Sequence, residues 1–414
     1  MNPIAGPRSP RFAQLPPLAL YVHIPWCLRK CPYCDFNSHE KKGELPEAQY
    51  VDALIADLEA SLPDVYGRKF ATVFIGGGTP SLFSPASIER LLTAVRTRIP
   101  FEFEAEVTME ANPGTFEAER FRGYREAGVT RLSIGVQSFD DERLAAIGRV
   151  HGAAEAKRAV ECALGLFDTV NVDLMYALPG QSLAGALADV GEAVALGAPH
   201  ISAYHLTLEP NTLFHRYPPK LPDDEVAADM QEAIEAALAA SGHEHYETSA
   251  FAKPGHRARH NLNYWTFGDY VGIGAGAHGK LSFRDRVQRE VRLRAPKAYL
   301  DAALAGNAVQ ERADVEAAQL PFEFLMNALR LTEGFPVALF GARTGLPIAT
   351  VERDLAAAEG EGFITRDLEA IRPTERGRHF LNDLLERFLP DDPAAGAMPV
   401  AFPINIASTD TRRS

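Results

Sequence analysis

The stretch YVHIPWCLRKCPYC, residues 21–34, brings three cysteines together in a chain that contains only four. So few cysteines in 414 residues exclude a disulfide-stabilised scaffold. Three thiolates in one loop can instead hold a soft metal centre, either zinc or an iron–sulfur cluster. A closed zinc site takes four ligands, and His23 or His39 could be the fourth. A cluster held by three cysteines would leave one iron open to a small molecule.

A short apolar run precedes the cysteines, and similar runs alternate with amphipathic helical stretches up to about residue 249. This alternation predicts βα units around a parallel sheet. The strand-like runs are Leu18–Ile24, Thr72–Ile75, Glu104–Glu110, Arg131–Val136, Thr169–Met175 and His200–Leu206. Charged or special residues follow the ends of these runs, and in a barrel such residues share the rim where ligands bind. We therefore predict an α/β fold with a partial TIM-type barrel of about six βα units rather than an open sheet.

The rest of the chain divides into segments of different composition. The barrel is expected to occupy residues 18–249, followed by a connecting segment at 250–295 that is rich in glycine, histidine and aromatic residues. Its arginine-rich end, 284–294, is expected to be a solvated hairpin or loop. Residues 296–389 show short helices, typical of a small α-rich, winged-helix-like domain. The tails at 1–17 and 390–414 are expected to be disordered.

Charge and hydropathy exclude several classes of function. The 42 Lys and Arg residues are outnumbered by 55 Asp and Glu, and the resulting net charge of -13 disfavours nucleic acid as the main partner. No stretch reaches the roughly 18 to 20 apolar residues that a membrane helix needs. The N-terminus lacks the apolar core of a signal peptide. The sequence therefore predicts a cytoplasmic protein without stable membrane insertion.

The cysteine loop resembles the signature of the radical S-adenosylmethionine (SAM) superfamily, C-x3-C-x2-C with an aromatic residue before the last cysteine. Cys27, Cys31, Tyr33 and Cys34 match this pattern directly after the first predicted strand. The resemblance implies that the three cysteines hold a [4Fe-4S] cluster, whose open iron chelates SAM. It also implies that such a cluster could deliver one electron to the sulfonium of SAM.

Later strand ends resemble the oxygen-independent coproporphyrinogen III oxidase-like branch of that superfamily. The matching stretches are GVQSF (135–139), GRVH (148–151) and NVDLMYALPG (171–180). The glycine run at 76–78 lacks Cβ atoms, so that backbone amides can approach a ligand closely. A loop near 274–279 resembles one that closes the SAM pocket. The SAM contacts that the resemblance implies are Tyr21, Tyr33, Gly77, Gly78, Thr79, Glu110, Gln137, Arg149, Asp173 and His278.

Two departures separate this chain from the oxidase itself. Phe36 stands where the oxidase has a fourth cysteine, and the segment before the first strand is shorter than in the oxidase. In addition, the motif HNLNYW (260–265) combines an imidazole that can ligate haem iron with rings that can stack on a macrocycle. These features resemble the haem-chaperone branch of the family. We therefore predict a haem chaperone with a SAM-binding cluster.

The chaperone resemblance implies haem as ligand and an acceptor haem protein as partner, such as a respiratory, membrane-associated one. The candidate haem-binding residues are His260, Tyr264, Trp265 and His23, with His260 as the first choice for the axial ligand. A radical SAM coproporphyrinogen III oxidase, which decarboxylates propionate side chains, is the alternative, and a structural zinc protein is the third hypothesis. The sequence does not decide whether SAM is cleaved.

Overall fold

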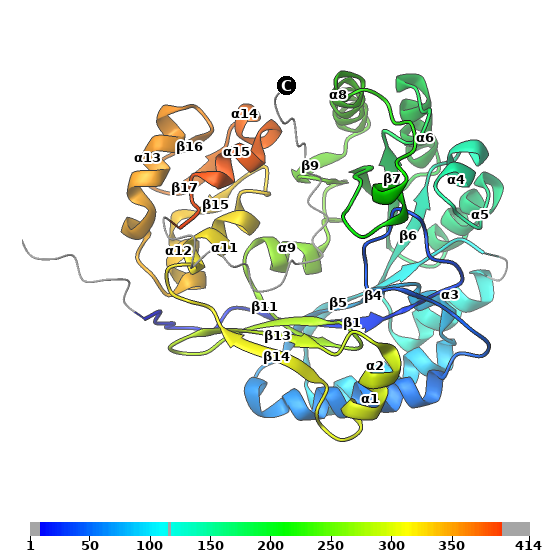
Figure 1. The fold of residues 1–414 in the computed structure, drawn as a ribbon, viewed down its shortest axis with the longest axis horizontal. Coiled ribbons are helices and arrows are strands. Elements are labelled where there is room, and N and C mark those ends of the chain that lie inside the picture. The colour runs from blue at the N-terminus through cyan, green and yellow to red at the C-terminus, as the bar shows by residue number, and fades with distance from the viewer. Residues whose placement is uncertain (1–8, 115–116, 391–414) are drawn as a thin grey trace, which may run out of the picture.

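Six parallel strands follow one another in the same order along the chain and across the sheet (Figure 1). The computed structural model describes residues 9–114 and 117–390. These strands are β1 (Leu18–Ile24), β4 (Phe70–Gly77), β5 (Phe101–Ala111), β6 (Arg131–Gln137), β7 (Thr169–Tyr176) and β8 (His200–His205). The helices between and after them are α1 (Glu47–Ser61), α2 (Pro85–Arg98), α3 (Glu117–Ala127), α4 (Asp141–Ala146), α5 (Ala153–Leu164), α6 (Leu183–Ala195), α7 (Leu213–Arg216) and α8 (Asp224–Ala240). The predicted α/β fold with a partial barrel is confirmed.

Burial on both faces explains why the parallel strands are continuous apolar runs in the sequence. In β1 only Tyr21 is not fully buried, because helices cover one face and the barrel interior lies on the other. Two of the crossover helices begin at side-chain caps. The Ser84 hydroxyl accepts from the Ser87 amide at the start of α2, and the Ser182 hydroxyl accepts from the Gly185 amide at the start of α6. Local sequence therefore determines where these two helices begin.

The sheet continues beyond the six parallel strands at both edges to make twelve strands in all. β11 (Asp269–Ile273) pairs in parallel with β1, and β12 (His278–Ser282), β13 (Val287–Arg292) and β14 (Val309–Asp314) add to it antiparallel. At the other edge β8 is followed by β10 (Ala250–Ala252) and β9 (Glu244–Glu247). The segment 250–295, predicted as a connection, thus supplies strands to both edges of the sheet.

The arginine-rich segment 284–294 lies in a hairpin, as expected, because β13 pairs antiparallel with β12, but the hairpin is not fully solvated. Arg292 on β13 is 1% exposed. The Arg292 guanidinium donates to Asp57 at 3.1 Å and also pairs with Glu290. Carboxylates from a distant helix and from its own strand therefore compensate the burial of this charge. A composition rich in arginine could not reveal these partners.

A second hydrophobic core belongs to a C-terminal domain of short helices. Its elements are α11 (Leu320–Ala328), β15 (Phe335–Pro336), α12 (Val337–Thr344), α13 (Glu352–Gly360), β16 (Ile364–Arg366), β17 (Ala370–Pro373), α14 (Glu375–His379) and α15 (Leu381–Glu386). The small sheet has the order β15-β17-β16. We expected the C-terminal domain to begin at residue 296. Its core begins later in the chain, because α10 (Pro296–Ala303) packs on α1 and β14 pairs with β13.

Short elements complete the description of the chain. They are β2 (Trp26–Cys27), β3 (His39–Glu40), α9 (Arg259–Trp265) and the 3-10 turns Leu62–Val65, Pro80–Leu82 and Ile348–Val351. Within the described ranges, no helix has the length and apolar character needed to cross a membrane.

The predicted N-terminal tail, 1–17, is ordered where the structure describes it. From residue 9 onward it lies against the C-terminal domain: Phe12 is 5% exposed in the second core, and the Arg11 amide donates to the Gly345 carbonyl at 3.0 Å. Residues 1–8 lie outside the described part of the chain, as does the predicted C-terminal tail from residue 391 on.

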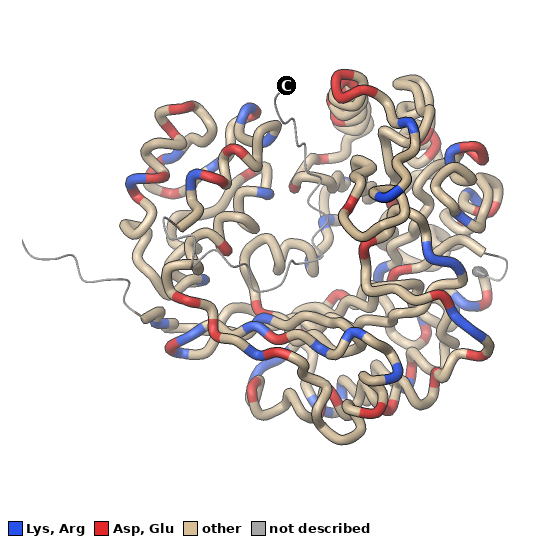
Figure 2. The backbone as a smooth tube through the Cα atoms, in the orientation of Figure 1, with Lys and Arg blue, Asp and Glu red and all other residues tan. Residues whose placement is uncertain are grey.

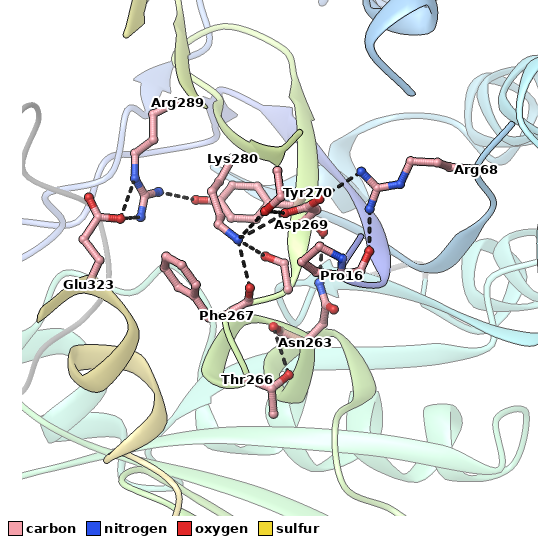
Figure 3. Close-up of polar contacts among 12 residues, drawn as sticks. Pro16, Arg68, Asn263, Thr266, Phe267, Asp269, Tyr270, Lys280, Arg289 and Glu323 are labelled. Atoms are coloured by element: carbon pink, nitrogen blue, oxygen red, sulfur yellow. Dashed lines mark hydrogen bonds and ion pairs between the residues drawn. The ribbon is translucent and has the colours of Figure 1, made fainter. Parts of the chain in front are cut away.

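A buried polar network joins β11 and β12 to the start of the barrel (Figure 3). The Asp269 carboxylate accepts from Lys280 Nζ at 3.1 Å, from Ser282 at 2.8 Å and from Arg68 at 2.8 Å. Asp269 is 0% exposed and Lys280 is 1% exposed. Burial lowers the pKa of Lys280 to about 8, against the opposing effect of Asp269. This carboxylate is therefore the counter-charge of a fully buried ammonium group.

Asp269→Ala should destabilise the fold by about 3–5 kcal/mol, because it leaves Lys280 buried without its counter-charge. The measurement is denaturant unfolding followed by circular dichroism. As a matched control, Asp52→Ala removes a carboxylate whose ion pair with Arg90 is 48% exposed on each side, and it should cost no more than about 1 kcal/mol. Equal losses in the two variants would contradict this account of the network.

Candidate functional site

A cavity of about 510 Å³ opens at the carboxyl ends of the parallel strands. Its wall includes the cysteine loop after β1, the turn after β4 and the end of β5. It continues down the barrel interior, where the first residues of β6 and β8 also line it. A volume of this size suits one small-molecule ligand with a few specific polar contacts.

The cysteine loop is held in shape by hydrogen bonds that do not involve the thiols. β2 pairs with β3, which joins the two ends of the loop. Lys30 Nζ donates to the carbonyl oxygens of Phe36 and Ser38 at 3.0 and 3.2 Å. The Cys34 amide donates to the Cys31 carbonyl at 3.2 Å, so that the last two cysteines share one turn. The loop is therefore organised around its sulfur atoms by its own backbone.

The thiols of this loop fit an iron–sulfur cluster better than a single metal ion. Cys27, Cys31 and Cys34 are free and half-buried, and Arg149 donates toward Cys31 Sγ at 3.8 Å. Within the described residues, no three His, Cys, Asp or Glu side chains are grouped so that they could hold one metal ion. A [4Fe-4S] cluster binds each thiolate on a different iron, so its sulfur ligands need not converge. His23, a possible fourth zinc ligand, has both ring nitrogens in hydrogen bonds.

The glycine run packs beneath the cysteine loop. The amides of Gly77, Gly78 and Thr79 each donate to another group of the protein, at 2.8–3.0 Å. These amides therefore bind groups of the protein itself, whereas we had expected them to approach a ligand. Gly77 has φ +115°, and a Cβ there would lie 2.7 Å from the His23 ring. The glycines are needed because the cysteine loop lies so close to β4.

Two half-buried carboxylates, those of Glu110 and Asp173, face the cavity. Burial, followed by the charge of Asp173, raises the pKa of Glu110 to about 8. Burial also raises the pKa of Asp173, although Ser133 and Asn171 donate to its two oxygens at 2.9 and 2.8 Å. Both groups thus resist ionisation in the ligand-free site, and a cationic ligand would favour their charged forms.

Arg149 connects the cysteine loop to the middle of the barrel rim. Its Nη2 donates to Asn112 Oδ1 at 2.7 Å and to the Gly135 carbonyl at 2.6 Å. Gln137 ends β6 with φ +71°, a left-handed conformation that is costly for a residue with a side chain. Tyr33 lines the same side of the cavity and packs on Phe214 of α7. Strand ends that are distant in sequence therefore meet at one place.

The cavity wall contains the three cysteines and eight of the ten residues predicted to contact SAM. The eight are Tyr33, Gly77, Gly78, Thr79, Glu110, Gln137, Arg149 and Asp173. Tyr21 and His278 are outside this wall. The Tyr21 hydroxyl is hydrogen-bonded to His23 Nδ1 at 2.9 Å, and the half-buried His278 begins β12.

His260 lies at the N-terminal end of α9, the short helix between the barrel and the C-terminal domain (Figure 1). It is 3% exposed, and burial lowers its pKa to about 3, so the imidazole is neutral. His260 Nδ1 is hydrogen-bonded to Thr72 Oγ1 at 2.9 Å, whereas Nε2 is buried without a partner among the described residues. The next residue, Asn261, lines the cavity. His260 therefore has one nitrogen oriented by the fold and one available.

Of the other two aromatic residues of the HNLNYW motif, Tyr264 is half-buried and Trp265 is buried. Tyr264 stacks on Tyr270, with ring centroids 4.4 Å apart. Trp265 is 8% exposed, lies under the Arg330 guanidinium and has an unpartnered Nε1. The motif thus forms part of the contact between the two domains, and of its residues only Asn261 lines the large cavity.

A set of polar residues on the interior face of the barrel was not predicted from the sequence. They alternate along three strands, so that every second side chain points inward. A polar residue at every second position of an otherwise apolar strand is the sequence pattern that indicates such residues. The residues are Arg131 and Ser133 on β6, Asn171 on β7, and His200, Ser202 and Tyr204 on β8.

Glu110→Gln should make the thermal stability of the ligand-free protein less dependent on pH between about 5 and 8. The folded-state pKa of Glu110, about 8, lies above its ordinary value of 4.5. Unfolding therefore releases a proton in this range, and stability falls as pH rises. Calorimetry at several pH values should show a smaller fall for the variant, while Glu59→Gln, at a side chain 50% exposed, keeps the wild-type slope. Parallel curves for wild type and Glu110→Gln would show that this carboxylate does not titrate as described.

Two family models match separate parts of the chain. The radical SAM superfamily matches residues 21–189, and the HemN C-terminal domain matches residues 315–380. The first range contains the cysteine loop and most of the cavity wall. The second coincides with the small domain described above.

Several proteins are similar to the chain over most of its length. The haem chaperone HemW of Escherichia coli K12 is 51% identical over 380 residues, which cover 91% of this chain and 100% of that protein. HemW of Haemophilus influenzae is 48% identical, with 92% and 100% covered. Among solved structures, the coproporphyrinogen III oxidase HemN of E. coli, a radical SAM enzyme, has a TM-score of 0.76 at 23% identity and 90% coverage of each chain, which shows a common fold. The extent and identity of the first two matches show that the chain belongs to the HemW family.

Proposed function

We propose that this protein is a haem chaperone, which binds haem and passes it to an acceptor haem protein. The observation that carries this proposal is the similarity to the haem chaperone HemW of E. coli over 91% of the chain and the whole of that relative. The HNLNYW motif supports it, because the fold places its histidine, tyrosine and tryptophan on one short helix at the domain contact.

A [4Fe-4S] cluster on Cys27, Cys31 and Cys34, with SAM beside it, is the second part of the proposal. Membership in the radical SAM superfamily and the three free thiols on the cavity wall support this assignment. When bound, the cluster would supply one electron to the sulfonium of SAM. Arg149 beside Cys31 would partly offset the negative charge of the thiolates.

The polar residues of the cavity suit SAM as a ligand. SAM carries a sulfonium and an ammonium group, and Glu110 and Asp173 are half-buried carboxylates on the cavity wall, where Arg131 is the cation that acts on Asp173. Binding a cation between them would favour their ionised forms and strengthen the contact.

His260 is the proposed axial ligand of haem. Neutral imidazole is the form that binds iron, and the Thr72 contact leaves Nε2 for the metal. Tyr264 and Trp265 on the same helix would pack against the macrocycle. His23 is the weaker candidate, because Tyr21 and the Asn37 carbonyl engage its two nitrogens.

Coproporphyrinogen III oxidase activity is not part of the proposal. The similarity to HemN is at the level of the fold. Phe36, at the position of the oxidase's fourth cysteine, lines the cavity and cannot supply a thiolate. We place the protein in the cytoplasm, where unoxidised thiols such as those of Cys27, Cys31 and Cys34 persist. The acceptor would be a respiratory, membrane-associated haem protein.

Nucleic acid is not a proposed partner. Figure 2 shows Lys and Arg interspersed with Asp and Glu along both the barrel and the C-terminal domain. The net charge of the whole chain is -13. Attraction to a polyphosphate would require a concentrated basic surface to overcome this charge.

A haem titration of anaerobically reconstituted protein tests the proposed function. We expect saturable binding of about one haem per chain, followed by transfer to an acceptor apoprotein. A parallel assay with coproporphyrinogen, SAM and a reductant should yield no decarboxylated product. Product formation without haem binding would overturn the chaperone proposal in favour of the oxidase.

Two single substitutions should separate the haem site from the cluster. His260→Ala should weaken haem binding and leave the iron content and the visible absorption of the cluster unchanged, because it removes only the proposed axial ligand. Cys31→Ala should remove the cluster absorption. Absorption spectroscopy and iron and sulfide analysis measure both effects. An unchanged haem titration for His260→Ala would exclude it as the ligand.

A further inference from the structure

The C-terminal domain contacts the open edge of the barrel sheet through its segment 329–333. The Thr248 amide donates to the Arg330 carbonyl at 3.1 Å, and the Thr332 amide donates to the Tyr246 carbonyl at 3.2 Å. Between these two bonds, Glu247 and Leu331 form an antiparallel bridge. The backbone of Arg330 is therefore held against β9 independently of its side chain.

The Arg330 side chain is buried without a direct partner. It is 6% exposed, and its guanidinium carbon lies 4.5 Å from the centroid of the Trp265 ring. Its Nε is buried with no hydrogen bond to the described residues. The carboxylate of Glu247 has the largest charge effect on the pKa of Arg330, but no ion pair within 4.0 Å joins the two side chains. The Glu247 Oε2 atom is likewise buried and unpartnered.

This arrangement differs from that of other cations stacked on aromatic rings in the same protein. Lys280 lies over a ring and is paired with Asp269. Arg376 also lies over a ring and donates to the Glu361 carbonyl at 3.0 Å. Buried charges usually have such partners, because an unpaired guanidinium loses its hydration without compensation. Among the described residues, Arg330 lacks such a partner, which leaves its charge available to an anionic ligand.

We propose that Arg330 binds a carboxylate of haem, so that the haem site is built jointly by helix α9 of the barrel and by the C-terminal domain. The inference rests on the proposed function. Haem carries two carboxylates at one edge and an iron atom that needs an axial ligand. Trp265, on which the guanidinium stacks, and His260 lie on the same short helix.

The chemistry of arginine suits this role. A guanidinium that stacks on an indole keeps its edge N–H groups free, and their planar fork matches a carboxylate. Burial lowers the pKa of Arg330, and the charge of Glu247 opposes this effect. A carboxylate from the ligand would add the direct hydrogen bonds that Glu247 does not make. Tyr204, which lines the large cavity, is also within electrostatic reach of Arg330.

The test compares haem with haem dimethyl ester, whose carboxylates are blocked, on the full-length reconstituted protein. Wild type should bind haem about tenfold more tightly than the ester, since a charge-assisted hydrogen bond is lost with the ester. Arg330→Gln should reduce haem affinity to the level of the ester and leave ester affinity unchanged. Arg330→Lys should keep a smaller preference for haem, because a point charge replaces the fork.

Controls separate this role from a structural one. Arg376→Gln changes another ring-stacked arginine of the same domain and should keep the wild-type preference. Equal weakening of haem and ester by Arg330→Gln would mean that Arg330 is only structural, and equal affinities in wild type would also overturn the proposal. If wild type binds neither compound, the proposed function itself fails. Because the backbone holds residue 330, thermal midpoints of the variants should stay near that of wild type.

Discussion

The site depends on one geometric constraint: parallel strands joined by helical crossovers all end at the same edge of the sheet. The cysteine loop follows β1, the glycine turn follows β4 and Glu110 lies near the end of β5. No two of these are close in sequence, yet all three line one cavity. Any change that broke the strand order would disperse them. The barrel therefore serves chiefly to gather groups that the chain keeps apart.

A second constraint is the cost of a polar barrel interior. The inward side chains include carboxylates, a guanidinium and an imidazole. The apolar outer faces of the same strands stabilise the fold in which these polar groups are held. Asn171 shows how the chain reduces this cost, since it bridges Asp173, Ser133 and His200. The hydrogen bonds are incomplete around Glu110, whose pKa is raised to about 8. A carboxyl group with a raised pKa, such as that of Glu110, is typical of a position where a cationic ligand binds.

The two domains meet at the HNLNYW motif. Helix α9 contributes His260 to the barrel side and Trp265 to the side of Arg330. Four of the eleven buried polar side-chain atoms that lack a partner among the described residues belong to these three residues and to Glu247. In most folded proteins such atoms are rare. Their presence at a domain contact agrees with the proposal that a ligand completes this site.

The sequence by itself was sufficient for the barrel and for most of the cavity wall. Apolar periodicity is local, and the cysteine loop carries its own ligands, so eight of the ten predicted SAM contacts and the three cysteines line the cavity. Only the tertiary structure decided the environment of His260, the burial of Arg292 and the missing partner of Arg330. These depend on contacts between segments that are distant along the chain, and neither composition nor periodicity specifies which groups such contacts bring together.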